Sequence, residues 1–169
     1  MRKDDKIHIH IVGSRDSGKT SFVIRVSENR FESFYIPSIA PEQTECQTML
    51  NYHIYNLKFH VSQFEEFDMN NIDDIDNRII VFYDESSNAS LTEAKRFITT
   101  IKNCNNKPYL TNMSIYLVGN KCDIQSTSAE VINDLNVFCN LHNIQLFHIS
   151  VKYNTSIPKL LRTIIIQNE

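Results

Sequence analysis

Nine residues near the start of the chain have the composition and spacing of a phosphate-binding loop. The stretch GSRDSGKTS at 13–21 places Gly13 five positions before Gly18, and Lys19 and Thr20 follow directly. Glycines let the backbone curl so that successive N–H groups point at a phosphate, and the N-terminus of a following helix adds partial positive charge. Lys19 would then reach the outer phosphates of a nucleotide, and the Thr20 hydroxyl would coordinate Mg²⁺. The motif therefore predicts a nucleotide-phosphate site.

A second polar motif, NKCD at 120–123, predicts where the nucleotide base lies. The motif follows the apolar run SIYLVG, and open α/β sheets bind ligands beyond the carboxyl ends of their strands. The Asp123 carboxylate can accept hydrogen bonds from the ring N–H and the exocyclic amine of guanine, a pair of donors that adenine lacks. The aliphatic stem of Lys121 can lie over the ring, and Asn120 can brace the neighbouring loops. An ATP-using P-loop enzyme is the alternative, in which Asp123 would play no part in the choice of nucleotide.

A third stretch, SVK at 150–152, follows the last predicted strand. Its position at the end of a strand places it beside the NKCD motif in a parallel sheet. The N–H of Val151 could meet the guanine carbonyl, which would complete the predicted base site.

Hydrophobic periodicity predicts the strands and helices that position these motifs. Strands are expected at 6–12, on both sides of Asn51 as a hairpin, and at 79–83, 114–120 and 144–150. Helices are expected at 20–31, 90–102, 128–142 and 157–166. Ser90 and Ser128 are the expected N-caps of two of these helices, and Pro158 suits the first turn of the last one. The alternation of strands and helices predicts a mostly parallel α/β sheet with helices on both faces.

The composition fits one globular domain that spans residues 1–169. Hydrophobic residues make up 41% of the chain and charged residues 22%, a globular rather than a disordered balance. The net charge of −3 argues against nucleic-acid binding through a basic surface. Four cysteines without a C-x-x-C pair indicate reduced thiols and a cytoplasmic location.

Direct membrane insertion is not expected. No apolar run approaches the roughly 18 residues of a membrane-spanning helix, and the start MRKDDK is no secretory signal. The chain ends IIIQNE without a prenylation cysteine, so a prenyl tail is absent from this chain. Membrane association would then require a partner protein or a tail beyond these residues.

Together, the motifs GSRDSGKTS, NKCD and SVK resemble those of the Ras-superfamily small GTPases in order and spacing. RFESFYIPSI at 30–39 resembles the family's first switch, and IIVFYDESSNASL resembles a Rab segment. The resemblance spans nearly the whole chain. It implies a small G-domain, which is a P-loop NTPase fold with a six-stranded, mostly parallel sheet and one antiparallel edge strand. It also implies binding of GTP or GDP with Mg²⁺, and effector, exchange or activating proteins as partners.

The resemblance further assigns roles to individual residues. Phe31 falls where the family places an aromatic ring against guanine. Ser38 falls on the switch threonine whose hydroxyl binds Mg²⁺ and senses the γ-phosphate, so Thr20 and Ser38 are the implied metal ligands. The implied nucleotide-binding residues are Asp16, Ser17, Gly18, Lys19, Thr20, Ser21, Phe31, Ser38, Asn120, Lys121, Asp123, Ser150, Val151 and Lys152.

The family's D-T-A-G-Q motif is missing after the second hairpin strand. The chain has NLKFHVSQFEEF there, and one register places Val61, Phe64 and Glu65 at the aspartate, glycine and glutamine. Sliding the register by one residue gives His60, Gln63 and Phe64 instead. Neither register restores the metal-binding aspartate, so we expect weakly held Mg²⁺. Glu65 or Gln63 occupies the region of the water-positioning glutamine and no catalytic residue is assigned, so intrinsic GTP hydrolysis is expected to be very weak or absent.

Two functional classes fit these features. The first is a Rab-like switch in vesicle trafficking or signalling, whose hydrolysis depends on an activating protein. The second is a pseudo-GTPase, an interaction module that holds nucleotide structurally. Arg15 lies where the family keeps a small residue facing the γ-phosphate. Its guanidinium either supplies charge there or points to solvent, and surface exposure is the commoner state of arginine.

Overall fold

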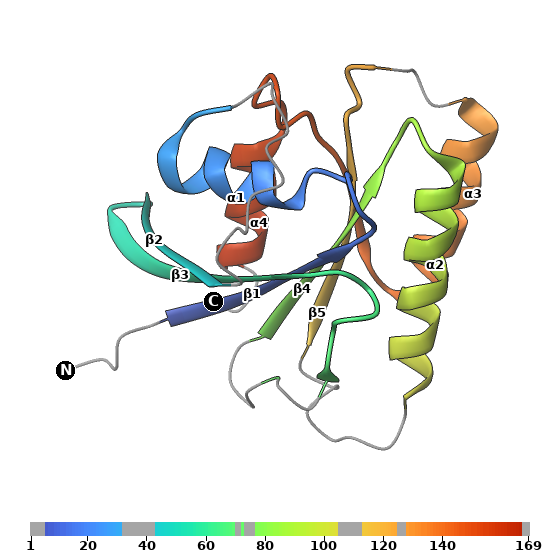
Figure 1. Ribbon diagram of the computed structural model, residues 1–169, viewed down its shortest axis with the longest axis horizontal. Coiled ribbons are helices and arrows are strands. Elements are labelled where there is room, and N and C mark those ends of the chain that lie inside the picture. The colour runs from blue at the N-terminus through green and yellow to red at the C-terminus, as the bar shows by residue number, and fades with distance from the viewer. Residues whose placement is uncertain are drawn as a thin grey trace.

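Six strands form one sheet, which the computed structural model shows with a layer of helices on each face (Figure 1). The structure describes residues 6–31, 43–69, 72, 77–104, 113–124 and 128–166. The strands are β1 (Lys6–Gly13), β2 (Gln43–Leu50), β3 (His53–Ser62), β4 (Asn77–Asp84), β5 (Ser114–Asn120) and β6 (Gln145–His148). The helices are α1 (Lys19–Glu28), α2 (Asn88–Asn103), α3 (Ala129–His142) and α4 (Ile157–Ile166).

The strand order is β2-β3-β1-β4-β5-β6, and among these described strands only the edge strand β2 runs antiparallel to its neighbour. β2 and β3 form the predicted hairpin, in which Asn51 and Tyr52 have φ values of 50° and 66°. Positive φ at both central residues defines the type I′ turn, whose twist matches that of paired strands. The predicted six-stranded, mostly parallel sheet with one antiparallel edge strand is therefore confirmed.

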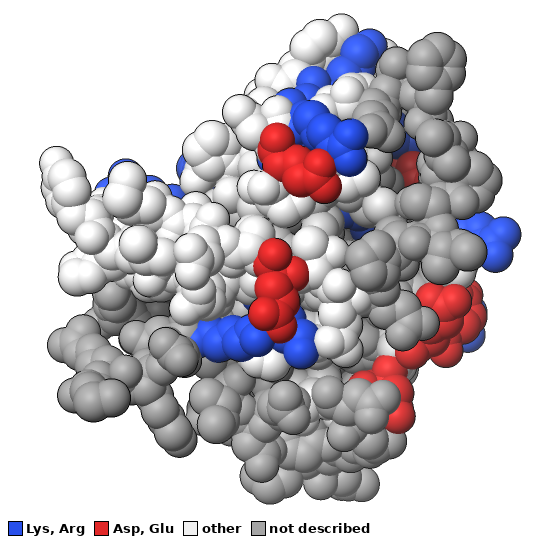
Figure 2. All heavy atoms as spheres, turned by 60° about the vertical axis from the view of Figure 1, so that its left-hand side comes forward, with Lys and Arg blue, Asp and Glu red and all other residues white. Residues whose placement is uncertain are grey.

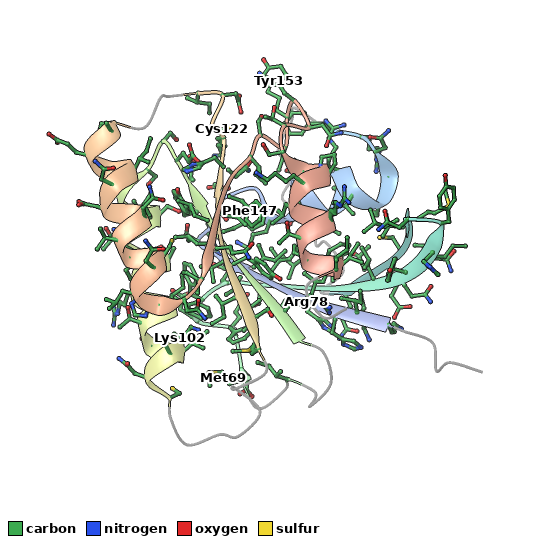
Figure 3. All side chains as sticks on the ribbon, turned by 180° about the vertical axis from the view of Figure 1, so that it is seen from behind. Met69, Arg78, Lys102, Cys122, Phe147 and Tyr153 are labelled. Carbon is green, nitrogen blue, oxygen red and sulfur yellow. The ribbon has the colours of Figure 1, made fainter. Side chains whose placement is uncertain are left out.

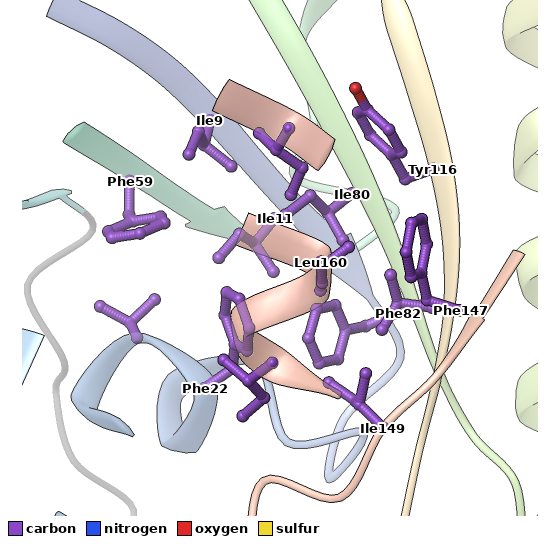
Figure 4. Close-up of a cluster of buried hydrophobic side chains, with 14 of the residues drawn as sticks. Ile9, Ile11, Phe22, Phe59, Ile80, Phe82, Tyr116, Phe147, Ile149 and Leu160 are labelled. Atoms are coloured by element: carbon purple, nitrogen blue, oxygen red, sulfur yellow. The ribbon is translucent and has the colours of Figure 1, made fainter. Parts of the chain in front are cut away.

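One face of the sheet packs against α1 and α4 (Figure 4). Side chains alternate along β1, so Ile9 and Ile11 both point into this core. Phe22 of α1 and Leu160 of α4 are fully buried against them. This packing fixes the start of α1 relative to the end of β1, and therefore also fixes the loop 14–18 that joins them.

The opposite face packs against α2 and α3. Val12 of β1 and Val81 of β4 are fully buried there, together with Ile98 of α2 and Leu135 of α3. The prediction of a strand buried on both faces at 79–83 is confirmed, because every residue of that run is buried. Two cores of this kind hold β1 and β4 rigidly at the centre of the sheet.

The start of α2 differs from the sequence prediction. Ser87, not Ser90, is the N-cap, and its side-chain oxygen accepts a hydrogen bond from the Ser90 N–H at 3.2 Å. The Ser90 hydroxyl is buried, accepts a hydrogen bond from the Asp84 N–H at 3.0 Å and lies 2.7 Å from the Ser14 hydroxyl. Ser90 therefore ties α2 to the loop after β1. The predicted N-cap of α3 is confirmed, because Ser128 accepts a hydrogen bond from the helix.

Other element ends lie close to their predicted positions. Helix α1 ends at Glu28 rather than at Phe31, because Asn29 adopts a left-handed conformation that stops the helix. Strand β6 is shorter than the predicted run at 144–150. Helix α4 matches its prediction, with Pro158 in the first turn.

Candidate nucleotide-binding site

The loops that follow β1, β4, β5 and β6 meet at one edge of the sheet. The strands are parallel, with Gly119 of β5 paired beside His148 of β6, so each carboxyl end delivers its loop to the same place. Figure 3 labels Cys122, from the loop after β5, and Tyr153, from the loop after β6, at this same end of the molecule. Parallel α/β sheets bind their ligands at such an edge.

The loop after β1 requires glycine at its second glycine position. Gly18 has a φ of 94°, a left-handed conformation that other L residues rarely adopt. A Cβ at Gly18 would lie 2.1 Å from Nδ2 of Asn120, so any side chain would displace that amide. The glycine therefore shapes the loop and also allows the loop after β5 to approach it.

Lys19 is a buried cation that backbone carbonyls hold in place. Its ammonium donates hydrogen bonds to the carbonyl oxygens of Gly13, at 2.8 Å, and of Ser14, at 2.7 Å. Burial lowers the pKa of Lys19 to about 8, although nearby acidic side chains, Glu66 first among them, partly oppose this shift. In the described ranges, no carboxylate forms an ion pair with this ammonium. An anion at the loop would supply the charge that a buried lysine favours.

The other residues of the predicted phosphate loop surround this position. Ser17 is fully buried, and its hydroxyl donates to the Ser14 carbonyl at 2.9 Å. Asp16 is exposed and has a left-handed φ of 60°. Thr20 and Ser21 lie in the first turn of α1 and are partly buried. The N–H groups of that turn have no partner within the helix, so they are available to an anion.

The Asn120 side chain joins the phosphate loop to the loop after β6. Its Nδ2 donates to the Ser17 carbonyl at 2.9 Å, and its Oδ1 accepts from the Val151 N–H at 3.1 Å. Asn120 is only 3% exposed, so water competes little for these bonds. The Val151 N–H, which the sequence places against a guanine carbonyl, is donated to Asn120 instead.

Lys121 and Asp123 lie on the turn after β5. The Lys121 ammonium forms an ion pair with Oδ2 of Asp84, at the end of β4, at 2.5 Å. Burial would raise the pKa of Asp84, but hydrogen bonds from Lys121 and Ser86 lower it below its ordinary value. This pair fixes the direction of the Lys121 stem. Asp123 is exposed and makes no ion pair or hydrogen bond with the other described residues.

The loop after β6 closes on itself. Ser150 is buried and pairs with Thr155 through two backbone hydrogen bonds. The Ser150 hydroxyl also accepts from the Tyr153 N–H at 3.2 Å. Lys152 is exposed, with its ammonium 4.9 Å from the centre of the Tyr153 ring. The predicted base-site residues Ser150 and Lys152 therefore belong to one short, internally bonded loop.

Arg25 is a residue of this region that the sequence analysis missed. Its guanidinium donates to the carbonyl oxygens of Val151, at 3.1 Å, and Lys152, at 3.0 Å. It also donates to the Asn29 carbonyl at 3.3 Å and lies 5.7 Å from the centre of the Phe31 ring. One side chain of α1 therefore holds both the loop after β6 and the predicted aromatic partner of the base.

The residues that follow β3 lie beside the phosphate loop. Gln63 Oε1 accepts a hydrogen bond from Arg15 Nε at 3.3 Å, so Gln63 rather than Glu65 contacts the loop directly. Arg15 is exposed, as the commoner state of arginine predicts, and it also contacts the residues after β3 through this hydrogen bond. Phe64 packs its ring 4.8 Å from the ring of Phe97 in α2. Glu65 is exposed.

Of the two hydroxyls that the resemblance implies as Mg²⁺ ligands, that of Thr20 belongs to a described residue, in the first turn of α1. Ser38 lies outside the described residues. Val61 and His60, which align with the missing aspartate, are in β3, where Val61 packs against the core and His60 stacks on His10 at 4.7 Å. The described ranges contain no cluster of three His, Cys, Asp or Glu side chains that could hold a metal. Mg²⁺ prefers oxygen ligands and retains water, so Thr20 would share the ion with phosphate oxygens and water.

A hydrogen-bonded histidine–glutamate pair links the ends of the strands that carry these loops. His148 Nδ1 lies 2.5 Å from Oε1 of Glu85, whose side chain is only 3% exposed. The Glu85 N–H donates to the Asn120 carbonyl at 2.9 Å, so the pair connects the ends of β4, β5 and β6. The hydrogen bond to Glu85 raises the pKa of His148 above its ordinary value.

Replacing His148 with glutamine is expected to destabilise the fold in a pH-dependent way. The pKa of His148 is higher in the folded chain, so its contribution is fully present below about pH 6.5 and is lost as pH rises through the folded-state pKa. We expect a loss of about 0.5–1 kcal/mol at low pH, because partial exposure screens the pair. Urea unfolding at about pH 6 and about pH 9 measures this loss of unfolding free energy. The variant His53→Gln, which changes an exposed histidine, is the control. Equal losses at both pH values would contradict this account.

The glycine-rich loop between β1 and α1, at the carboxyl edge of a parallel sheet, defines the class of P-loop α/β proteins. A model of the Ras family matches residues 8–168, so the chain belongs to the Ras family. It is 26% identical over 164 residues to Ras-related protein Rab-32C of Dictyostelium discoideum, covering 94% of this chain and 71% of that relative. It is 22% identical over 166 residues to Ras-related protein RabZ of the same organism, covering 94% and 69%. The predicted Rab-like membership of the Ras superfamily is confirmed.

The described surface offers two further observations. None of the described helices combines the length and the apolar content that crossing a membrane requires. On the face in Figure 2, basic and acidic side chains lie next to one another. Among the described ion pairs, Glu45 lies 2.5 Å from Lys6 and 3.8 Å from Lys58.

Proposed function

We propose that this domain binds GDP and GTP at the carboxyl edge of its sheet and acts as a Rab-like, guanine-nucleotide-dependent switch with very weak intrinsic hydrolysis. The observation that carries the proposal is the Asn120 side chain, which bonds to both the phosphate loop and the loop after β6. These bonds support the proposal that the predicted phosphate-binding and base-binding segments form one continuous site, from Lys19 to Asp123.

Each end of the nucleotide has its own set of residues in this proposal. Lys19 and the free N–H groups at the start of α1 bind the phosphates. Asp123 accepts hydrogen bonds from the ring N–H and the amine of guanine. The Lys121 stem, directed by its ion pair with Asp84, lies over the ring, and Phe31 contacts its edge. Mg²⁺, when bound, neutralises phosphate charge.

The contacts of Gln63 support the proposal of weak hydrolysis. Its Oε1 accepts from Arg15 and its Nε2 donates to Glu66 at 3.1 Å, so the amide is not free to orient a water molecule. Glu65 as a carboxylate accepts hydrogen bonds but donates none. Intact members of the class hydrolyse GTP at only about 10⁻⁴ s⁻¹ without help. We therefore expect turnover near zero unless an activating protein supplies the catalytic groups.

Nucleotide extraction tests the binding proposal. Protein purified without added nucleotide is denatured, and the released compound is identified by chromatography, with GDP or GTP as the expected result. Single-turnover hydrolysis of GTP with Mg²⁺ then measures the chemical step. An adenine nucleotide in the extract, or an empty protein that gives no calorimetric heat with excess GDP, would overturn the proposal.

A pseudo-GTPase that holds nucleotide as a structural ligand is the second candidate. It is favoured by the aromatic anchoring of the residues after β3, where Phe64 packs on Phe97 rather than leaving the segment free to switch. The rate of nucleotide exchange distinguishes the two candidates. A switch releases GDP faster when an exchange protein is added, whereas a structural nucleotide remains bound. In both cases we propose a cytoplasmic protein that works through effector, exchange or activating proteins, with vesicle trafficking as the expected setting and membranes reached through a partner.

A further inference from the structure

The strand order places the two ends of a bound nucleotide on opposite flanks of β1. β5 and β6, which carry the predicted base loops, lie on one side of β1, and β3 lies on the other. A nucleotide with its base at Asp123 and its phosphates over Lys19 therefore points its last phosphate toward the residues that follow β3. We call these residues the 63–66 segment. This step rests on the proposed function.

A chain of hydrogen bonds links the phosphate loop to the 63–66 segment. Arg15 Nε donates to Gln63 Oε1 at 3.3 Å. The Glu66 carboxylate accepts from the Gln63 N–H at 2.9 Å and from Gln63 Nε2 at 3.1 Å. Gln63 therefore binds the exposed Glu66 carboxylate through its backbone N–H and its Nε2, while its Oε1 contacts the loop through Arg15.

Aromatic contacts anchor the segment on both sides of Glu66. The ring of Phe64 lies 4.8 Å from the ring of Phe97 in α2, and the ring of Phe67 lies 5.4 Å from the same ring. Phe67 also meets His10 of β1 edge-on at 6.0 Å. These contacts anchor the segment to α2 and β1 on both sides of Glu66.

The segment also sets the charge around Lys19. Glu66 acts most strongly of the nearby charged groups on the Lys19 ammonium, followed by Asp16 and Glu65, and all three favour the protonated lysine. These carboxylates place negative charge near the phosphate end of the site and only partly oppose the effect of burial on Lys19. The guanidinium of Arg15 is hydrogen-bonded to the Gln63 amide. A third phosphate would add negative charge at this end of the site, whereas a diphosphate ends before it.

We propose that the 63–66 segment makes the site selective for a nucleoside diphosphate over the triphosphate, because the fixed Glu66 carboxylate repels the third phosphate. Loading of GTP requires the segment to move, and the chain of bonds from Arg15 to Glu66 identifies the contacts that a partner protein has to break.

Affinities of GDP and of GTP with Mg²⁺ test this selectivity by calorimetry on wild-type protein and on Glu66→Gln. Wild type is expected to bind GDP roughly tenfold more tightly than GTP. Glu66→Gln is expected to strengthen GTP binding roughly three- to tenfold and leave GDP binding unchanged, since the glutamine oxygen can still accept one of the two hydrogen bonds from Gln63. The wild-type preference for GDP over GTP is also expected to become smaller as the salt concentration rises from about 50 to about 500 mM, because salt screens the repulsion between Glu66 and the third phosphate.

Two variants control for the charge and its position. Glu93→Gln makes the same change on the exposed surface of α2 and is expected to leave the preference intact. Glu66→Asp keeps the charge and is expected to keep most of the preference. Equal wild-type affinities for GDP and GTP, or an effect of Glu66→Gln that is equal on both, would overturn the inference. A wild-type protein that binds neither nucleotide would overturn the proposed function instead.

Discussion

Replacing Asp123 with alanine is expected to weaken GDP binding by at least about a hundredfold while leaving the fold intact. Two guanine donors lose a charged acceptor, and a hydrogen bond to a charged group contributes about 1.5–3 kcal/mol. The fold is expected to survive because Asp123 is exposed on a turn and bonds to no other described side chain. Calorimetric titration measures the affinity, and the thermal unfolding midpoint measures the fold.

A second variant separates recognition of the base from support of the loop. Asp123→Asn replaces one acceptor oxygen with an amide donor, and xanthosine diphosphate carries a carbonyl where guanine has its amine. This variant is therefore expected to lose GDP and to gain xanthosine diphosphate. Loss of both nucleotides from a stable protein would show that Asp123 supports the turn. Unchanged nucleotide choice in Asp123→Ala would favour an ATP-using P-loop enzyme.

The sheet could be predicted because each strand carries its own signal. The apolar run at 79–83 is buried on both faces, and the alternation along β1 separates two cores, so local pattern and environment agree. The N-cap of α2 could not be predicted in the same way. Ser87 and Ser90 are equivalent by type, and what places Ser90 inside the helix is a contact with Ser14, 76 residues away.

The candidate site shows the same difference between residues with a local sequence signal and residues placed by long-range contacts. The side chains expected to touch nucleotide lie in short motifs, so Lys19 and Asp123 could be proposed from spacing. The side chains that position them come from distant parts of the chain. Arg25 and Val151 are 126 residues apart, and Arg15 and Gln63 are 48 residues apart. No periodicity or motif contains such pairs, because they arise only when the strand order brings the loops together.

Replacing Arg25 with alanine is expected to weaken GDP and GTP binding equally, by about tenfold, mainly through faster dissociation. The guanidinium holds the Val151 and Lys152 carbonyls and lies against Phe31, so its loss frees both predicted walls of the base pocket. A tenfold change corresponds to about 1.4 kcal/mol, the scale of one or two charged hydrogen bonds. Release of a fluorescent GDP analogue into excess GDP measures the dissociation rate.

Three comparisons assign the effect to positioning rather than to charge or stability. Arg162→Ala removes an exposed arginine from α4 and is expected to leave release unchanged. Arg25→Lys keeps the charge but lacks the planar fork that reaches two carbonyls, so it is expected to restore only part of the loss. The ratio of GDP to GTP affinity is expected to stay constant in Arg25→Ala, because Arg25 acts on the base end and Glu66 on the phosphate end. A changed ratio of GDP to GTP affinity in Arg25→Ala would show that Arg25 does not act on the base end alone. Unchanged release of the GDP analogue from a folded Arg25→Ala protein would show that Arg25 does not position the base pocket.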